Sequence, residues 1–90
     1  MAITPDIERI VWALENEGYR VDIEQHAGNV TLTASKGSLK VNILFQREAG
    51  TIKRVFLSFS DRPGLTVLKC EEPDKVEDCI RKLLDALKRA

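Results

Sequence analysis

The chain has 90 residues, 43% of them hydrophobic and 31% charged, and its 14 basic residues balance its 14 acidic ones. This composition excludes an intrinsically disordered chain, and the length suits a single domain that spans residues 1–90. No apolar run approaches the roughly 20 residues of a membrane-spanning helix, and residues 1–6 lack the basic and apolar regions of a signal peptide. We therefore expect one soluble cytoplasmic domain.

Charge is unevenly distributed along the chain. Residues 1–35 hold six acidic and two basic residues, whereas residues 36–69 hold seven basic and two acidic ones. The balanced total argues against a nucleic-acid binder, but the excess in the middle of the chain predicts a basic patch there.

The first segment predicts a helix between Thr4 and Gly18. Thr4 is a good N-cap, Pro5 fits the first helical position, and Gly18 stands where a C′ glycine belongs. Apolar side chains recur at helical spacing and form one stripe, at Ile7, Ile10, Val11 and Leu14. Trp12 is out of phase with that stripe, so it either packs over a sheet edge or is an exposed interface anchor for a partner.

Two strands are predicted next, over residues 19–25 and 30–35, because apolar and polar side chains alternate there. The inward residues are predicted to be Tyr19, Val21, Ile23, Val30, Leu32 and Ala34. Turns are predicted at residues 27–29 and 35–38, where Gly37 is free to adopt a positive φ.

Residues 39–60 predict a long hairpin with a turn at residues 48–51. One face is entirely apolar and is predicted to be core: Leu39, Val41, Ile43, Phe45, Val55, Leu57 and Phe59. The other face mixes the cations Lys40 and Arg54 with two apolar side chains, Leu44 and Phe56.

A turn at residues 61–64 leads to a fifth strand over residues 65–71. This strand is apolar on both faces, with Leu65 and Val67 on one and Leu68 and Cys70 on the other, so we expect both faces to be covered. A partner subunit is one way to cover it, which makes Leu68 an interface candidate.

The last helix begins near Pro73, with either Glu72 or Asp74 as its N-cap. Its apolar stripe consists of Val76, Cys79, Ile80, Leu83, Leu84 and Leu87. Cys70 and Cys79 are predicted to be small buried residues, or a disulfide if the source is a hyperthermophile.

These elements predict an α+β fold of order α-β-β-β-β-β-α. Short turns favour an antiparallel five-stranded meander, and the simplest packing places both amphipathic helices on the one apolar face of the sheet. The other face is then open to solvent, a partner or a ligand.

The sequence offers little for catalysis. His26 is the only histidine and adjoins a turn, and no metal-binding or phosphate-loop spacing is present. We therefore predict a non-enzymatic protein without a metal or other cofactor.

The open face is the candidate site. Basic residues around an exposed aromatic suit a single-stranded nucleic acid, whose bases stack on the ring while the cations hold phosphates. The predicted contacts are Lys40, Leu44, Arg54 and Phe56, extended at the hairpin ends by Lys36 and Lys53. The alternative is a protein-interaction or assembly module, chaperone-like, in which Leu44, Phe56 and Trp12 receive a peptide or a second subunit. With either function we expect the chain to form a homo-oligomer, a dimer or a tetramer.

The layout adds one resemblance. A helix that ends in ENEGYRVDIE, a meander with a basic and apolar face, and a closing helix DKVEDCIRKLLDALKRA resemble the ThermoDBP-like single-stranded DNA-binding proteins of thermophiles. The resemblance covers most of the chain and implies self-association. It also implies DNA contacts by Phe56, Leu44, Lys40 and Arg54.

Overall fold

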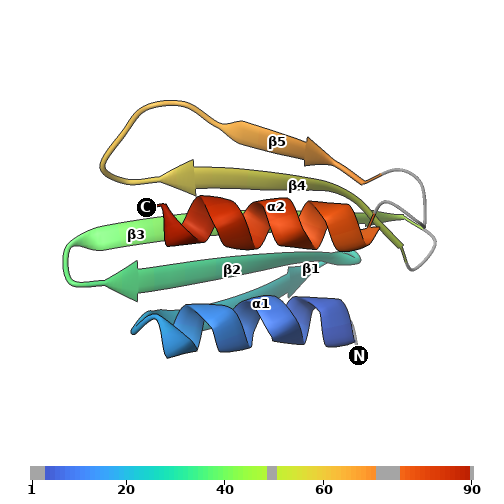
Figure 1. Ribbon diagram of the computed structural model, residues 1–90. Helices are drawn as coiled ribbons and strands as arrows, with labels where there is room; N and C mark the ends of the chain where they lie inside the picture. Colours follow the sequence, from blue (N-terminus) through green and yellow to red (C-terminus); the bar gives the residue numbers. More distant parts are fainter. Residues whose placement is uncertain (1–3, 49–50, 71–75, 90) are drawn as a thin grey trace.

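A computed structural model describes residues 4–48, 51–70 and 76–89. Its elements follow in the order α1 (Pro5–Asn16), β1 (Arg20–His26), β2 (Asn29–Lys36), β3 (Leu39–Glu48), β4 (Thr51–Phe59), β5 (Thr66–Lys69) and α2 (Val76–Lys88) (Figure 1). The strands form one antiparallel sheet in the order β1-β2-β3-β4-β5. The predicted α+β meander is therefore confirmed. The tip of the predicted turn at residues 48–51 and the predicted start of the last helix lie outside the described residues.

The two ends of α1 follow the predicted capping signals. Oγ1 of Thr4 accepts a hydrogen bond from the Ile7 N–H at 3.5 Å, and Pro5 is the first helical residue. Beyond the C-terminus, Gly18 has a φ of +93°. The Gly18 N–H donates to Glu15 and the Tyr19 N–H donates to Leu14. This pair of bonds is a Schellman motif, which ends the helix and turns the chain into β1.

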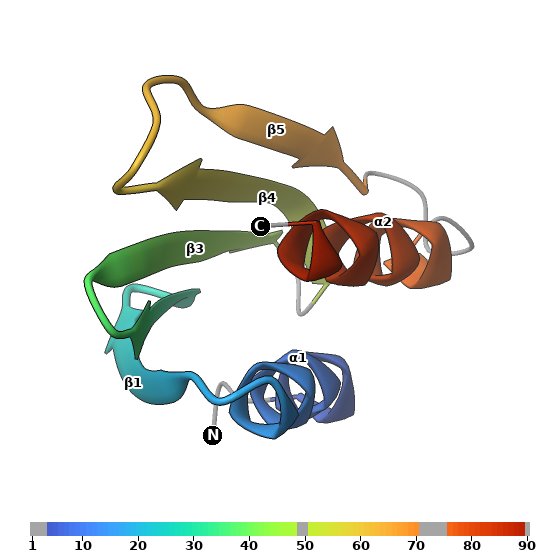
Figure 2. The same cartoon turned by 60° about the vertical axis from the view of Figure 1, so that its left-hand side comes forward.

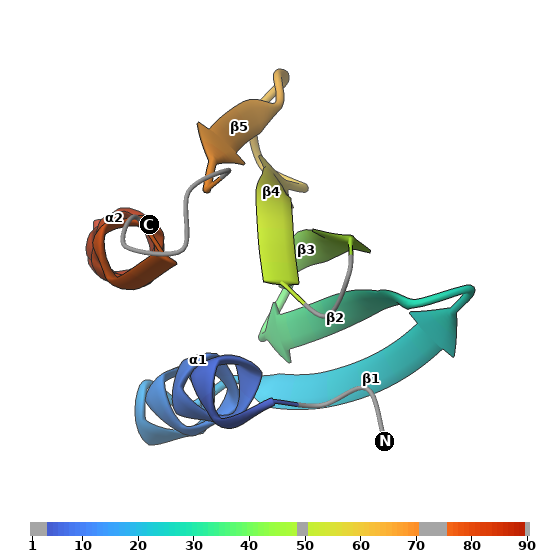
Figure 3. The same ribbon diagram turned by 90° about the vertical axis from the view of Figure 1, so that its right-hand side faces the viewer.

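Both helices lie on the same side of the sheet (Figures 2 and 3), as predicted. A single apolar cluster fills the space between the layers. On the sheet side, Leu32, Ile43 and Leu57 lie next to one another across three strands, and each is at most 1% exposed. The helices contribute Ile7, Ile10, Leu14, Cys79, Ile80, Leu83 and Leu87. This core leaves the opposite face of the sheet without a covering helix.

The edge strand β1 differs from the prediction at Ile23. Its register with β2 pairs Ile23 with the buried Leu32, so it lies on the core face, yet it is 40% exposed. The strand runs away from α1 toward the β1–β2 turn (Figure 3). Tyr19 is buried and Val21 is half-buried near the helix, whereas the far end of β1 extends beyond the helical cover.

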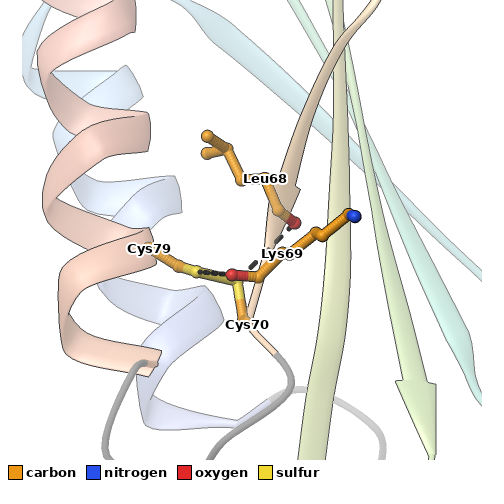
Figure 4. Close-up of a disulfide and its surroundings, with 4 residues drawn as sticks. All are labelled: Leu68, Lys69, Cys70 and Cys79. Carbon is orange, nitrogen blue, oxygen red and sulfur yellow. Dashed lines mark hydrogen bonds between the residues drawn. A yellow bond between two sulfur atoms is a disulfide. The ribbon is translucent and has the colours of Figure 1, made fainter.

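The two cysteines form a disulfide that joins the residue after β5 to the first turns of α2 (Figure 4). Their Cα atoms are 5.9 Å apart, and both residues are buried. The Sγ atom of Cys79 also lies 3.1 Å from the backbone carbonyl oxygen of Lys69. Of the two alternatives that the sequence left open, the structure has the disulfide. It fastens one end of α2 to the edge of the sheet.

Within the described parts of the chain, neither helix has the length and apolar character needed to cross a lipid bilayer.

Candidate functional site

The face of the sheet opposite the helices, here called the open face, is defined by the strand register. One row of neighbours across the sheet consists of Glu24, Thr31, Leu44, Phe56 and Val67. In β2, β3 and β4 the residues on either side of this row are buried in the core, so the row itself lies on the face away from the helices. The next row holds Asp22, Thr33, Asn42 and Ser58.

A shallow hollow of about 290 Å³ lies at the centre of the open face. It is lined by Thr31, Asn42, Leu44, Phe56, Ser58 and Leu65. Leu44 and Phe56 are half-buried and form its apolar floor, while Thr33 stands beside it and donates a hydrogen bond to Oδ1 of Asn42 at 3.3 Å. A shallow apolar hollow with polar groups at its rim suits a flat ring with polar edges.

Cations lie on the open face toward both ends of the hollow. Lys40 precedes Leu44 on β3 by four residues, or about 13 Å at about 3.3 Å per residue. Arg54 precedes Phe56 on β4 by two residues, about 7 Å, and its cross-strand neighbour is Lys69 of β5. Lys40, Arg54 and Lys69 are all exposed. A polyanion that runs along β3 and β4 would therefore pass a cation on each side of Phe56.

Acidic groups lie at the other edge of the open face. The register places Asp22 beside Thr33 and Glu24 beside Thr31, and both acids are exposed. Oε2 of Glu24 is 3.1 Å from Nε2 of His26. On this face β1 therefore carries the acids Asp22 and Glu24 in the two rows beside the hollow and the cation Arg20 one row further, in the row of Lys40, whereas β4 and β5 carry Arg54 and Lys69. This polarity disfavours an anionic ligand on β1 and favours one on the β3–β5 side.

The structure brings four predicted contacts together and separates the other two from the hollow. Lys40, Leu44, Arg54 and Phe56 share the open face. Lys36 instead lies over the Tyr19 ring, 5.6 Å from its centroid, on the helical side of the sheet. It belongs to the same face as the core residues of β2, which alternation along the strand already implied.

Lys53 lies in an irregularity of the sheet that the alternation of apolar and polar residues does not predict. The register between β3 and β4 shifts after Gln46, which pairs with Arg54, because the next residue, Arg47, pairs with Ile52. Lys53 is the extra residue of this β-bulge. It lies next to Arg54 rather than within the hollow.

Neither predicted interface residue lies on the open face. Trp12 is 66% exposed on α1, in the helical layer, so it does not pack over a sheet edge and does not join the hollow. Leu68 packs against the core because it pairs with the buried Val55. The exposed apolar residues near β5 are instead Leu65 and Val67, at 59% and 42%.

Leu65, Val67 and Lys69 are the open-face residues that sequence reasoning missed. The three residues are spaced by two, so alternation places them on one common face of the strand. Alternation alone does not say whether this face is the open one, because the apolar Leu68 and Cys70 make the opposite face equally plausible. The pairing of β5 with β4 decides it. Within the described ranges, no three His, Cys, Asp or Glu side chains gather as ligands for a metal.

Comparisons of the chain with protein-family models, with curated proteins and with solved structures found no match.

Proposed function

We propose that the protein binds single-stranded nucleic acid, and DNA in particular, on the open face of its sheet. The observation that carries this proposal is the position of Phe56. Its half-buried side chain lines the central hollow, and Lys40 and Arg54 lie on the same face toward the two ends of that hollow. The arrangement combines a stacking ring with cations along one direction, which is how sequence-tolerant single-strand binders hold their ligands.

The mechanism follows from these groups. A base that stacks on Phe56 contributes about 1–3 kcal/mol, and Leu44 and Leu65 provide further apolar contact beside the ring. Lys40, Arg54 and Lys69 attract the phosphates, and the acids of β1 keep the strand on the β3–β5 side. Paired bases inside a duplex are already stacked and cannot lie flat on this ring, so the proposal includes a preference for single strands.

The resemblance of the layout to the ThermoDBP-like proteins supports DNA as the ligand and a thermophilic source. The Cys70–Cys79 disulfide agrees with a cytoplasmic location in such an organism, because intracellular disulfides are common in hyperthermophiles.

The stacking role is tested by comparing Phe56→Ala with Trp12→Ala. Both variants remove an aromatic side chain, but Trp12 is exposed in the opposite layer. Phe56→Ala should weaken binding of a labelled single-stranded oligonucleotide by about 1–3 kcal/mol, and Trp12→Ala should bind like the unchanged protein. Equal affinities for both folded variants would refute the role of Phe56.

A second candidate function is a protein-interaction module that forms homo-oligomers. Leu65 and Val67 extend the apolar surface of Leu44 and Phe56, and a second copy of the chain could cover it. Two copies could also form one groove for nucleic acid. Sedimentation equilibrium over a range of protein concentrations tests the association. Apolar association should change little with salt, whereas oligonucleotide affinity should fall steeply.

A further inference from the structure

A second, more polar pocket lies at the end of the sheet where the bulge between β3 and β4 occurs. Its volume is about 430 Å³, and it is lined by Asn29, Gln46, Arg47, Glu48, Lys53 and Arg54. It shares no lining residue with the central hollow. One of its lining residues, Arg54, is however only two residues before Phe56 in the sequence.

The bulge explains why this pocket is rich in cations. Consecutive side chains of a regular strand point to opposite faces, so Lys53 and Arg54 would normally diverge. A bulge re-aims its side chains by adding one residue to the ladder, and here Lys53 and Arg54 line the same pocket. Ile52, at 5% exposure, anchors the chain on the core side just before the bulge.

One backbone–backbone hydrogen bond and one backbone–side-chain hydrogen bond hold the bulge from its two sides. The Lys53 carbonyl accepts from the Cys70 N–H at 2.7 Å, and Cys70 is in turn bonded to α2 through the disulfide. On the other side, the Arg47 N–H donates to Oδ1 of Asn29 at 3.3 Å. Because that oxygen accepts, the NH₂ group of the same amide can serve as a donor to a ligand. These hydrogen bonds therefore hold the backbone that forms the pocket in place within the sheet.

The chemistry of the lining selects an anion with more than one charge. Its described residues comprise three cations, one carboxylate and two amides. A phosphodiester carries one negative charge, whereas a phosphomonoester carries about −1.5 to −2 at pH 7 and offers three acceptor oxygens. Guanidinium groups bind such oxygens in pairs. The monoester is thus the closer match in charge and in acceptors.

We infer that this pocket binds the terminal phosphate of the strand that lies across the open face. This inference rests on the proposed function and deepens it: Arg54 lines the pocket and lies on the open face two residues before Phe56, so a strand stacked on Phe56 would direct one end toward the bulge. Only a strand end carries a monoester, so the protein would distinguish phosphorylated ends from strand interiors.

The test uses one labelled oligonucleotide sequence in three forms: with a 5′-phosphate, with a 3′-phosphate and with neither. In anisotropy titrations at pH 7.5, one phosphorylated form should bind about tenfold or more tightly than the unphosphorylated form, as charge-assisted hydrogen bonds imply. This gain in affinity from the terminal phosphate should disappear in Lys53→Gln and persist in Lys82→Gln, which removes an exposed cation from α2. It should also shrink at pH 5.5, because the second phosphate proton binds near pH 6.

Equal affinities of all three forms for the unchanged protein would overturn the inference while leaving the proposed function standing. A gain that Lys53→Gln and Lys82→Gln reduce alike would also overturn it, because the effect would then be one of general charge. Failure of the unphosphorylated form to bind at low salt would instead refute the proposed function. Inorganic phosphate at matched ionic strength should compete away the gain and leave the affinity of the unphosphorylated form unchanged.

Discussion

Leu44 of β3 and Phe56 of β4 are directly opposite each other in the antiparallel ladder, on the face that neither helix covers. Both are half-buried, and the next residue in the same row is the exposed Val67. Leu44, Phe56 and Val67 therefore form an apolar strip on this face, and Leu65 extends it. Polar side chains surround the strip, and the cations Lys40, Arg54 and Lys69 lie on the same face. The proposed binding of nucleic acid rests on this strip.

The burial pattern predicts that a Leu→Ala substitution lowers the stability of the protein much more at Leu57 than at Leu65. Leu57 is 1% exposed in the core, and Leu65 is 59% exposed beside the hollow. Leu57→Ala should lower the free energy of unfolding by about 2–5 kcal/mol, whereas Leu65→Ala should change it by less than about 0.5 kcal/mol. Urea denaturation followed by circular dichroism measures both. Similar losses at the two sites would contradict the assignment of core and open faces.

The end of α1 predicts a backbone effect at Gly18. Its φ of +93° disfavours any residue with a Cβ, and the nearest atom to such a Cβ would be Cε of Lys36 at 3.5 Å, an ordinary contact. Gly18→Ala should therefore lose about 1–2 kcal/mol through backbone strain alone. Gly18→Asn should lose less, because Asn tolerates left-handed conformations better. Thermal unfolding of both variants checks the order, and an unchanged Gly18→Ala variant would refute it.

The disulfide predicts a stability that depends on reductant. Linking residues nine apart in sequence limits the unfolded chain, and the expected contribution is roughly 2–3 kcal/mol. Reduction should therefore lower the melting temperature, and the released Cys79 thiol would have the Lys69 carbonyl oxygen as an acceptor.

The matched control for reduction is the double variant Cys70→Ala/Cys79→Ala. Its melting temperature should be lower than that of the oxidised protein and should not respond to reductant. A thiol assay that finds two free thiols in the protein purified without reductant would contradict the disulfide itself.

The cations of the open face predict a change in salt dependence. For single strands, the slope of log K against log salt is about −0.7 per phosphate contacted. Lys40→Gln should make the slope less steep by about 0.7, provided that Lys40 holds one phosphate. Lys82→Gln, an equal charge change on α2, should leave the slope unchanged. Identical slopes for the two variants would remove Lys40 from the site.

The sequence was sufficient for most of the architecture because its local signals agree with one another. Thr4 and Pro5 mark the start of α1 and Gly18 follows its end, as predicted. Alternation also assigned the faces of β2, β3 and β4 correctly. Those strands have one apolar face each, so a shift of one residue would bury polar side chains. The same alternation is enough to predict that Leu44 and Phe56 share the open face.

The remaining features depend on tertiary relationships that local patterns do not contain. Leu68 turned inward because of its pairing with Val55, and a strand that is apolar on both faces cannot indicate that choice. Ile23 is exposed because the far end of β1 extends beyond the helix that packs on this face of the sheet. The bulge at Lys53 likewise depends on how β3 and β4 pair, and the disulfide between Cys70 and Cys79 depends on how the end of β5 meets α2.

The most direct test of the central claim is an anisotropy titration of a labelled single-stranded DNA oligonucleotide at low and moderate salt, with the matching duplex alongside. Binding to open-face cations and Phe56 predicts that the single strand binds at low salt, binds more tightly than the duplex, and loses affinity steeply as salt rises. Absence of binding at low salt, or an affinity that does not change with salt, would contradict the account.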